Sequence, residues 1–300
     1  MRYMPIMIAL LISTPLAAEP MRDAPELVAT IATRTDTAMR MTVPVTIEGR
    51  GPYHFVVDTG SDRTVVSQEL ATLLKLAVGQ TVTMHSMTGV GPANTVMVPT
   101  LTLAGQTTRD INAPALQQAY LGGHGLLGID TLKGRRVVMD FANRTLSVLR
   151  AGEREDYDPD TIVVTARSKF GQLVLVDADV DGTPITVIID SGAETTVGNA
   201  ALRALLSKRN RKMQFFKTDI IDVTGGRLGA EYASVGRIRL AGITIENPVV
   251  AFADAHPFKR YGLLNKPAML LGMDTLRSFR RVSVDFAQRT VRFLPPGTLG

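Results

Sequence analysis

Two aspartates in this sequence stand where a carboxylate is costly to hold unless it is used. Asp58 and Asp190 each follow three apolar residues and precede a hydroxyl residue and a glycine, in FVVDTG and VIIDSG. Each carboxylate would therefore lie at the end of a buried strand, in a tight turn that glycine permits. There it would be shielded from water and would lie beside a hydroxyl. Such carboxylates have perturbed pKa values and are typical of acid–base sites. Asp58 and Asp190 are therefore the candidate catalytic residues.

The surroundings of these two motifs also occur twice. Residues 126–149 and 270–294 match, and both contain Leu-Leu-Gly followed one residue later by Asp-Thr-Leu. The two aspartate motifs lie 132 residues apart and the two Leu-Leu-Gly segments 144 apart, so we expect an insertion, at the basic and loop-like residues 207–217. Two repeats are too few for a solenoid. The duplication therefore indicates two copies facing each other, a dimer fused into one chain.

Other aspartates recur in both halves, so recurrence alone does not single out the first pair. Asp140 and Asp285 stand at the end of a predicted hairpin strand, where a carboxylate can accept from its own backbone. Asp130 and Asp274 precede Thr-Leu, and we expect them to cap short helices. Both of these pairs are predicted to be structural.

On these motifs the halves resemble retropepsin-type aspartic protease subunits, in the form of the bacterial retropepsin-like aspartyl proteases. The resemblance rests on Asp58-Thr59-Gly60 and Asp190-Ser191-Gly192 after apolar strands, and on the two Leu-Leu-Gly segments. It covers about residues 40–149 and 170–294. It implies an all-β, bilobal acid-protease fold of two duplicated β-barrel-like halves with few short helices. It also implies a cleft between the lobes and hydrolysis of a polypeptide substrate by water shared between the two aspartates, with no metal or other cofactor.

The resemblance gives the neighbouring residues supporting roles. Thr59 and Ser191 would lock the two turns together by hydroxyl-to-backbone hydrogen bonds across the interface. Ser61 follows the first motif, whereas the second half has alanine at that place. A hydroxyl donating to Asp58 would favour its ionised form, so we expect Asp190 to carry the shared proton more often.

Each half also has a candidate flap, a glycine-tipped hairpin that could close over a bound peptide. The first is predicted at residues 85–96 and the second at residues 219–234, and a plain surface hairpin is the alternative for both. The candidate substrate-binding residues at the tips are Thr88, Gly89, Val90, Gly91, Thr224, Gly225 and Gly226.

The elements expected to position these residues are mostly strands. Alternating or short apolar runs predict strands at 41–47, 53–57 and 185–189, and a hairpin at 136–141 with 145–149. Helical spacing of apolar residues predicts helices at 67–76, with Ser67 as its cap, and at 199–206.

Composition excludes several other classes of protein. The 300 residues are 45% hydrophobic and 20% charged, with a formal charge of +5, as in an ordinary globular chain. The sequence has no cysteine, and its four histidines form neither an HExxH motif nor a close pair, so disulfides and a metal site are not expected. It has no tryptophan and 5% aromatic residues, which argues against nucleic-acid binding. The basic run at 208–212 is predicted to be a solvated loop.

The amino terminus has the layout of a secretory signal, with Arg2, a short apolar run and small residues through Ala18. We therefore expect an exported, periplasmic protein without stable membrane insertion. The expected organisation is a signal peptide at 1–18, a loose leader at 19–35, a first half at 36–150, a linker at 151–161 and a second half at 162–295. A monomer, as an internal pseudo-dimer, is expected. Two alternatives remain open: a catalytically silent peptide-binding or assembly module of the cell envelope, and pairing of halves between molecules.

Overall fold

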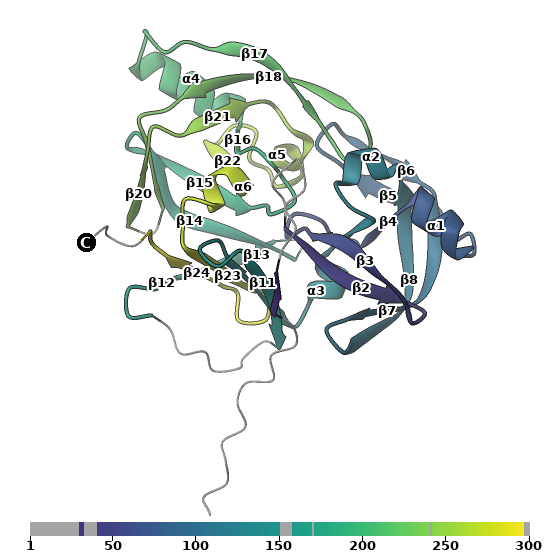
Figure 1. Ribbon diagram of the computed structural model, residues 1–300. Coiled ribbons are helices and arrows are strands. Elements are labelled where there is room, and N and C mark those ends of the chain that lie inside the picture. The colour runs from purple at the N-terminus through teal and green to yellow at the C-terminus, as the bar shows by residue number, and fades with distance from the viewer. Residues whose placement is uncertain (1–29, 33–40, 151–157, 170, 241, 297–300) are drawn as a thin grey trace, which may run out of the picture.

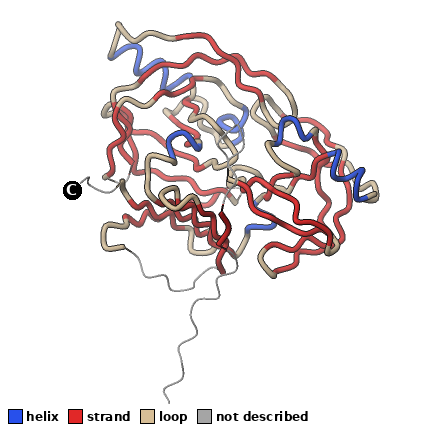
Figure 2. Tube along the Cα trace, viewed as in Figure 1, coloured by secondary structure: helices blue, strands red, loops and turns tan. Residues whose placement is uncertain are grey.

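The computed structural model describes residues 30–32, 41–150, 158–169, 171–240 and 242–296. Strands dominate these residues and helices are few and short, as Figure 2 shows. The fold is therefore all-β and bilobal, as predicted. The predicted signal peptide, most of the leader and most of the linker lie outside the described residues. Within the described residues, we find no helix with the length and hydropathy needed to span a lipid bilayer.

The first half folds around a barrel whose strands alternate between buried and exposed side chains. Val43, Val45 and Ile47 of one strand are all buried in its interior, as the predicted alternation requires. Among the described residues the closed barrel runs in the order β2 (Thr42–Ile47), β3 (Arg50–Val57), β9 (Gly125–Leu127), β4 (Val65–Ser67), β8 (Gln106–Leu116) and β7 (Thr95–Leu103).

The second half repeats this strand order, but two of its strands are divided. The counterparts of β7 and β8 are each broken in two at residues 235–236 and 247–248. At this break Asn247 has a left-handed backbone, with φ at +51°, and Pro248 has no N–H to donate. Two backbone hydrogen bonds still cross it, from Val235 N to Pro248 O and from Asn247 N to Gly236 O. The strands are β13 (Arg167–Lys169), β14 (Gln172–Val180), β15 (Thr183–Ile189), β16 (Val197–Gly198), β17 (Phe216–Ile221), β18 (Arg227–Ser234), β19 (Arg237–Leu240), β20 (Ile243–Glu246), β21 (Val249–Phe252) and β22 (Ala268–Leu271).

A third sheet belongs to both halves and joins them, and in Figure 1 it lies below the second half and beside the first. Its centre is an antiparallel pair with one strand from each half. One correction arises here: residues 30–32, predicted as part of a loose leader, pair with β11 in the same way that β12 pairs with β24. In the described part of the chain the sheet runs β1 (Thr30–Ala32), β11 (Thr145–Arg150), β10 (Arg135–Asp140), β23 (Arg281–Asp285), β24 (Thr290–Leu294) and β12 (Ile162–Thr165).

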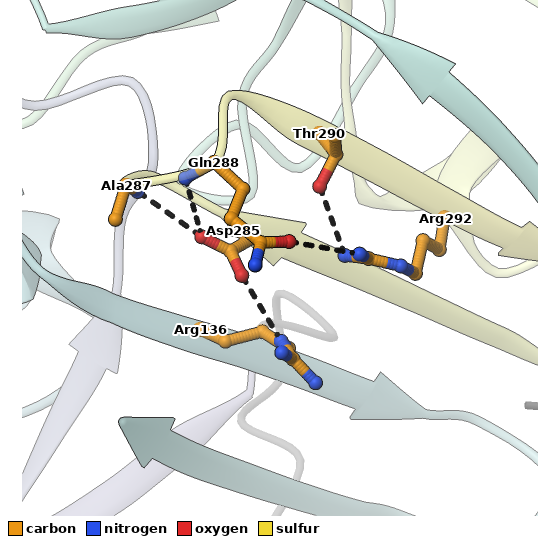
Figure 3. Close-up of polar contacts among 6 residues, drawn as sticks. All are labelled: Arg136, Asp285, Ala287, Gln288, Thr290 and Arg292. Atoms are coloured by element: carbon orange, nitrogen blue, oxygen red, sulfur yellow. Dashed lines mark hydrogen bonds and ion pairs between the residues drawn. The ribbon is translucent and has the colours of Figure 1, made fainter. Parts of the chain in front are cut away.

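Two ion pairs cross this sheet between the halves in a symmetric arrangement. Arg136 on β10 donates to Asp285 on β23 at 3.2 Å, and both side chains are almost fully buried. Arg281 on β23 donates to Asp140 on β10 at 2.9 Å. Figure 3 shows Asp285 also accepting from the backbone N–H groups that follow its strand, and Asp140 accepts from Asn143 N. The predicted turn-stabilising role of both aspartates is confirmed, and each also pairs with an arginine of the other half.

The helices lie at strand ends. Ser67 caps the first, accepting from Leu70 N at 3.0 Å as predicted, and Asn199 caps its counterpart in the same way. That counterpart extends three residues beyond the predicted end, so the basic run at 208–212 begins in its last turn, where cations favour a helix, and is not wholly a loop. The described helices are α1 (Gln68–Leu74), α2 (Gln118–Leu121), α3 (Ile129–Leu132), α4 (Ala200–Arg209), α5 (His256–Arg260) and α6 (Met273–Leu276).

Candidate active site

Each candidate aspartate follows the last residue of a buried strand. Asp58 directly follows β3, and its backbone N–H donates to Leu127 O at 3.0 Å. Asp190 directly follows β15, and its N–H donates to Leu271 O at 3.1 Å. The Leu-Leu-Gly strands β9 and β22 run parallel to β3 and β15 and hold the two aspartates at equivalent places. The side chain of Asp58 is buried and that of Asp190 is partly exposed.

The residues after the aspartates join the two halves by four hydrogen bonds. Thr59 Oγ1 donates to Ile189 O at 3.1 Å and accepts from Ser191 N at 3.0 Å. Ser191 Oγ donates to Val57 O at 2.8 Å and accepts from Thr59 N at 3.1 Å. Both hydroxyls are buried, and each belongs to one half while bonding the backbone of the other. The lock implied by the resemblance is present, and it brings the two aspartate turns together at the interface between the halves. We call this part of the interface the seam.

The two glycines have a different role from the one expected. Neither Gly60 nor Gly192 has a left-handed backbone, so the turn itself does not require glycine. A Cβ at Gly60 would instead lie 2.5 Å from Cγ of Asp190, and a Cβ at Gly192 would overlap the carboxylate of Asp58. Each glycine therefore leaves room for the carboxylate of the opposite half. This reciprocal contact sets the two carboxylates on either side of the same seam.

Backbone N–H groups stabilise both carboxylates. Asp58 Oδ1 accepts from Gly60 N at 2.9 Å, and Asp190 Oδ1 accepts from the N–H groups of Gly192 and Ala193 at 3.1 Å each. Hydrogen bonds to the charged form favour ionisation, which opposes the effect of burial.

The expected hydrogen bond from Ser61 to Asp58 is wrong. Ser61 Oγ donates its one proton to Arg63 O at 2.8 Å, two residues further along the loop. A carbonyl so close in the chain competes with the carboxylate for the hydroxyl. Ser61 therefore supports the loop after the turn, and the predicted bias of the shared proton toward Asp190 loses its basis.

In each half a threonine and an aspartate hold that loop. Their positioning role was not predicted from the sequence. Thr64 donates to Asp130 through both its backbone N–H and its hydroxyl, and Thr196 does the same to Asp274. The expected capping role is wrong in detail, because Gly128 and its counterpart occupy the N-cap positions of α3 and α6. The available signal in the sequence was a threonine at the same distance after each of Asp58 and Asp190, together with the repeated Asp-Thr-Leu.

The glycine of each Leu-Leu-Gly segment lies against the same loop. A Cβ at Gly128 would collide with the backbone of Arg63, and one at Gly272 would lie 2.6 Å from the backbone carbon of Thr195. These glycines let the short helix and the aspartate loop approach closely. The aspartate turns are therefore fixed from behind as well as across the seam.

Two hairpins close over the seam. In the first, β5 (Val82–His85) pairs with β6 (Val90–Ala93), and Ser86 N donates to Gly89 O at 2.8 Å. The tip is therefore 86–89, so Thr88 and Gly89 lie in it, whereas Val90 and Gly91 lie on β6. The predicted place of Val90 and Gly91 at the tip is therefore wrong, because the pairing of β5 with β6 already begins at His85 and Val90. In the second hairpin, β17 pairs with β18, and Thr224, Gly225 and Gly226 lie in the loop between them.

The hairpin tips contact each other, and each tip also packs against the opposite half. Asp222 Oδ2 accepts from Thr88 N at 3.1 Å and from Thr88 Oγ1 at 2.6 Å. Met87 packs against the apolar cluster of the second half, and Val223 packs against that of the first. Burial of Asp222 would raise its pKa, but hydrogen bonds from Thr224 and Thr88 outweigh it and the pKa is lowered. We call the contact between Asp222 and Thr88 the tip latch.

A small cavity, about 40 Å³, lies beneath the first hairpin and beside Asp190. The side chain of Gln172, from β14, lines it and donates to Gly60 O. This volume suits one or two waters and is far below what a peptide side chain with its backbone requires. The cavity as it stands has no room for an extended peptide beside Asp190. Within the described ranges, His, Asp and Glu side chains do not gather in groups of three that could hold a metal ion.

Comparison with protein families matches both halves. The family described as "gag-polyprotein putative aspartyl protease" matches residues 43–134, and the family described as "Aspartyl protease" matches residues 176–275. Each match contains one of the two aspartate motifs and the Leu-Leu-Gly segment that follows it. No curated protein matches the chain.

Proposed function

We propose that this chain, which belongs to the retropepsin-like aspartyl proteases and carries two such domains in tandem, is an endopeptidase that uses Asp58 and Asp190 as a single dyad. The observation that carries the proposal is the reciprocal contact at the seam. Each aspartate turn is bonded to the backbone of the other half, and each glycine makes room for the opposite carboxylate. A polypeptide is the proposed substrate.

Two carboxylates at such a seam cannot both ionise cheaply, so the pair holds one proton over a wide pH range, as aspartic protease dyads do. The ionised member takes a proton from a water as that water attacks the scissile carbonyl. The protonated member donates a hydrogen bond to the carbonyl oxygen and stabilises its developing negative charge. The apparent pKa values belong to the pair, and neither aspartate is assigned a fixed role.

The hairpins complete the proposed site. Their separation would admit an extended peptide, which could then add as a strand along the hairpin backbone. Thr88 and Thr224 stand at the two tips and are the proposed contacts to the peptide backbone.

The test is cleavage of an unfolded protein or a peptide library at mildly acidic pH. Asp58→Asn and Asp190→Asn should each abolish cleavage while the thermal unfolding midpoint stays close to that of the wild type. Asp110→Asn is the matched control, because Asp110 is exposed and its left-handed backbone suits asparagine. Equal cleavage by the dyad variants would refute the proposal. Peptide binding without cleavage, in wild type and variants alike, would instead indicate the silent peptide-binding module.

The proposed location is the periplasm, reached by export, and it rests on the amino-terminal sequence. Mass measurement of the protein recovered from a bacterial periplasmic fraction tests it: a mature chain that starts near Glu19 is expected. A full-length chain retained in the cytoplasm would contradict it. The proposed monomer is tested by the mass of the mature protein in solution.

A further inference from the structure

The cavity beside Asp190 is lined by basic side chains from two separate elements. His85 reaches it from β5 of the first hairpin, and His256 and Arg260 reach it from α5 of the second half. Arg260 already has an anionic partner, because its Nη1 lies 2.6 Å from Oδ2 of Asp62. The two histidines are therefore the basic side chains beside the dyad that an entering anion could contact.

The two histidines form one hydrogen-bonded unit. His85 Nδ1 and His256 Nε2 lie 2.9 Å apart, and the rings are stacked with centroids 5.2 Å apart. The backbone fixes this geometry, because His256 N donates to Met87 O at 2.9 Å. Such a pair can take up one proton and keep its N–H···N hydrogen bond, since one nitrogen still donates and the other still accepts. The unit then carries one positive charge at the cavity.

The charges around this unit favour an anion. Burial lowers the pKa of His256, and the neighbouring charges of His85, Lys259 and Arg260 lower it further. The negative charges nearby are Asp62, held by Arg260, and the dyad with its shared proton. A carboxylate placed against the histidines would offset the mutual repulsion of the basic groups.

The opposite side of the cleft has a different chemistry. There the second hairpin tip lies against Tyr120 of α2, since a Cβ at Gly225 would collide with that ring. Val223 packs against the apolar cluster that includes Leu121 and Leu126. The segment QAYL of α2 carries no charge, whereas its counterpart HPFKR in α5 carries two fixed cations and a histidine.

We propose that the subsite on the Asp190 side of the cleft binds an acidic side chain of the substrate, with His85 and His256 as the residues that select it. The inference rests on the proposed function and names its substrate class: peptides with aspartate or glutamate on one side of the scissile bond and an uncharged residue on the other. Opening of the hairpins enlarges the cavity, and the substrate carboxylate then accepts from the protonated histidine pair.

The experiment uses fluorogenic peptides that differ only by Glu or Gln at each position from three residues before to three residues after one scissile bond. We expect kcat/KM to favour Glu about tenfold at one position, the effect of one charge-assisted hydrogen bond. The ratio should be largest between about pH 4.3, above which glutamate is ionised, and about pH 6.5, below which histidine is protonated. The lowered pKa of His256 moves the upper edge of this window toward acid.

Variants separate selection by the histidines from a general effect of charge. His256→Gln and His85→Gln, one on each element, should each bring the Glu/Gln ratio close to one. Lys259→Gln is the matched control, because it removes a cation from the same helix at an exposed position outside the cavity lining. A ratio that falls equally in all three variants would overturn the selective role of the histidine pair.

The outcomes also distinguish this inference from the proposed function. Equal cleavage of the Glu and Gln peptides at every position, abolished by Asp58→Asn, would overturn the subsite and leave the protease function standing. If no peptide is cleaved, the protease function fails, and calorimetric binding of the same peptides decides the subsite. Tighter binding of a Glu peptide that His256→Gln abolishes would support it, and equal binding would overturn it.

Discussion

The contact between Gly60 and the carboxylate of Asp190 leads to a quantitative prediction for Gly60→Ala. The added Cβ would lie 2.5 Å from Asp190 Cγ, whereas ordinary van der Waals contact begins at 3.4 Å. The carboxylate must therefore retreat by about 0.9 Å, or the two turns must separate by a similar distance. A displacement of about 1 Å in a reacting group can cost about 100-fold in rate.

We therefore expect Gly60→Ala to lower kcat for peptide cleavage about 100-fold, with KM changed much less. Overpacking of this kind should also cost about 1–3 kcal/mol of unfolding free energy, measured by urea denaturation. Because the halves are symmetric at this point, Gly192→Ala should behave alike through Asp58. The two variants test the reciprocal contact from both sides of the seam.

Gly229→Ala is the control for the loss of glycine itself. Gly229 lies on β18, its backbone is not left-handed, and no described atom lies within 4 Å of a Cβ placed there. It should keep the wild-type kcat and stability. A folded Gly60→Ala protein with wild-type kcat would refute the reasoning, because Asp190 could then move without affecting the reaction.

Three further predictions concern the contacts that hold the site. Thr59→Val removes a hydroxyl that bonds two buried backbone groups of the other half, so it should cost about 2–4 kcal/mol of unfolding free energy relative to Thr59→Ser; equal denaturation midpoints would contradict it. Arg136→Met should lower the free energy of unfolding by about 3–5 kcal/mol, because the buried Asp285 loses its cationic partner. Adding Asp285→Asn should recover part of that loss in a double-mutant cycle. Asp222→Asn should speed amide hydrogen exchange at both hairpin tips. Because the pKa of Asp222 is lowered, the tip latch should persist as pH falls from 7 to 5 and weaken only below about pH 4, and loosening between pH 7 and 5 would count against it.

The sequence allowed the fold class and the central residues to be predicted because the same signal occurred twice. A strand of three apolar residues followed by Asp, a hydroxyl and Gly is weak evidence in one copy. Two copies, each followed further along the chain by a Leu-Leu-Gly segment, indicate two halves and one shared site. The cap Ser67 was also predicted, since capping depends on residues three apart in the chain, and Asn199 repeats this cap in the second half.

Features that depend on competing partners in space were beyond such reasoning. Ser61 could donate to Asp58 or to a nearby carbonyl, and only the loop geometry decides for Arg63 O. Residues 30–32 lack a strong strand pattern, and their pairing depends on the free edge that β11 offers. The His85–His256 pair joins residues 171 positions apart, and the sequence contains no local sign of it.

The contacts that join the halves and the residues that line the cleft follow different rules. At their interface the two halves are nearly equivalent. Thr59 corresponds to Ser191, and the Arg136–Asp285 ion pair corresponds to the Arg281–Asp140 ion pair. Each of these contacts joins a polar group of one half to a polar group of the other. A substitution in one half therefore leaves a buried polar group of the other half unpaired.

The residues that line the cleft have no such constraint, because they would contact the substrate and not the equivalent residues of the other half. In a homodimer of identical subunits both sides would carry the same residues, so a histidine pair on one side would require a histidine pair on the other. Fusion into one chain removes that requirement, and α5 can carry cations where α2 carries none. A peptide bound across this cleft would therefore meet a basic subsite at one end and an apolar, aromatic one at the other. The single chain thus permits a fixed direction of substrate binding, which a symmetric dimer cannot impose.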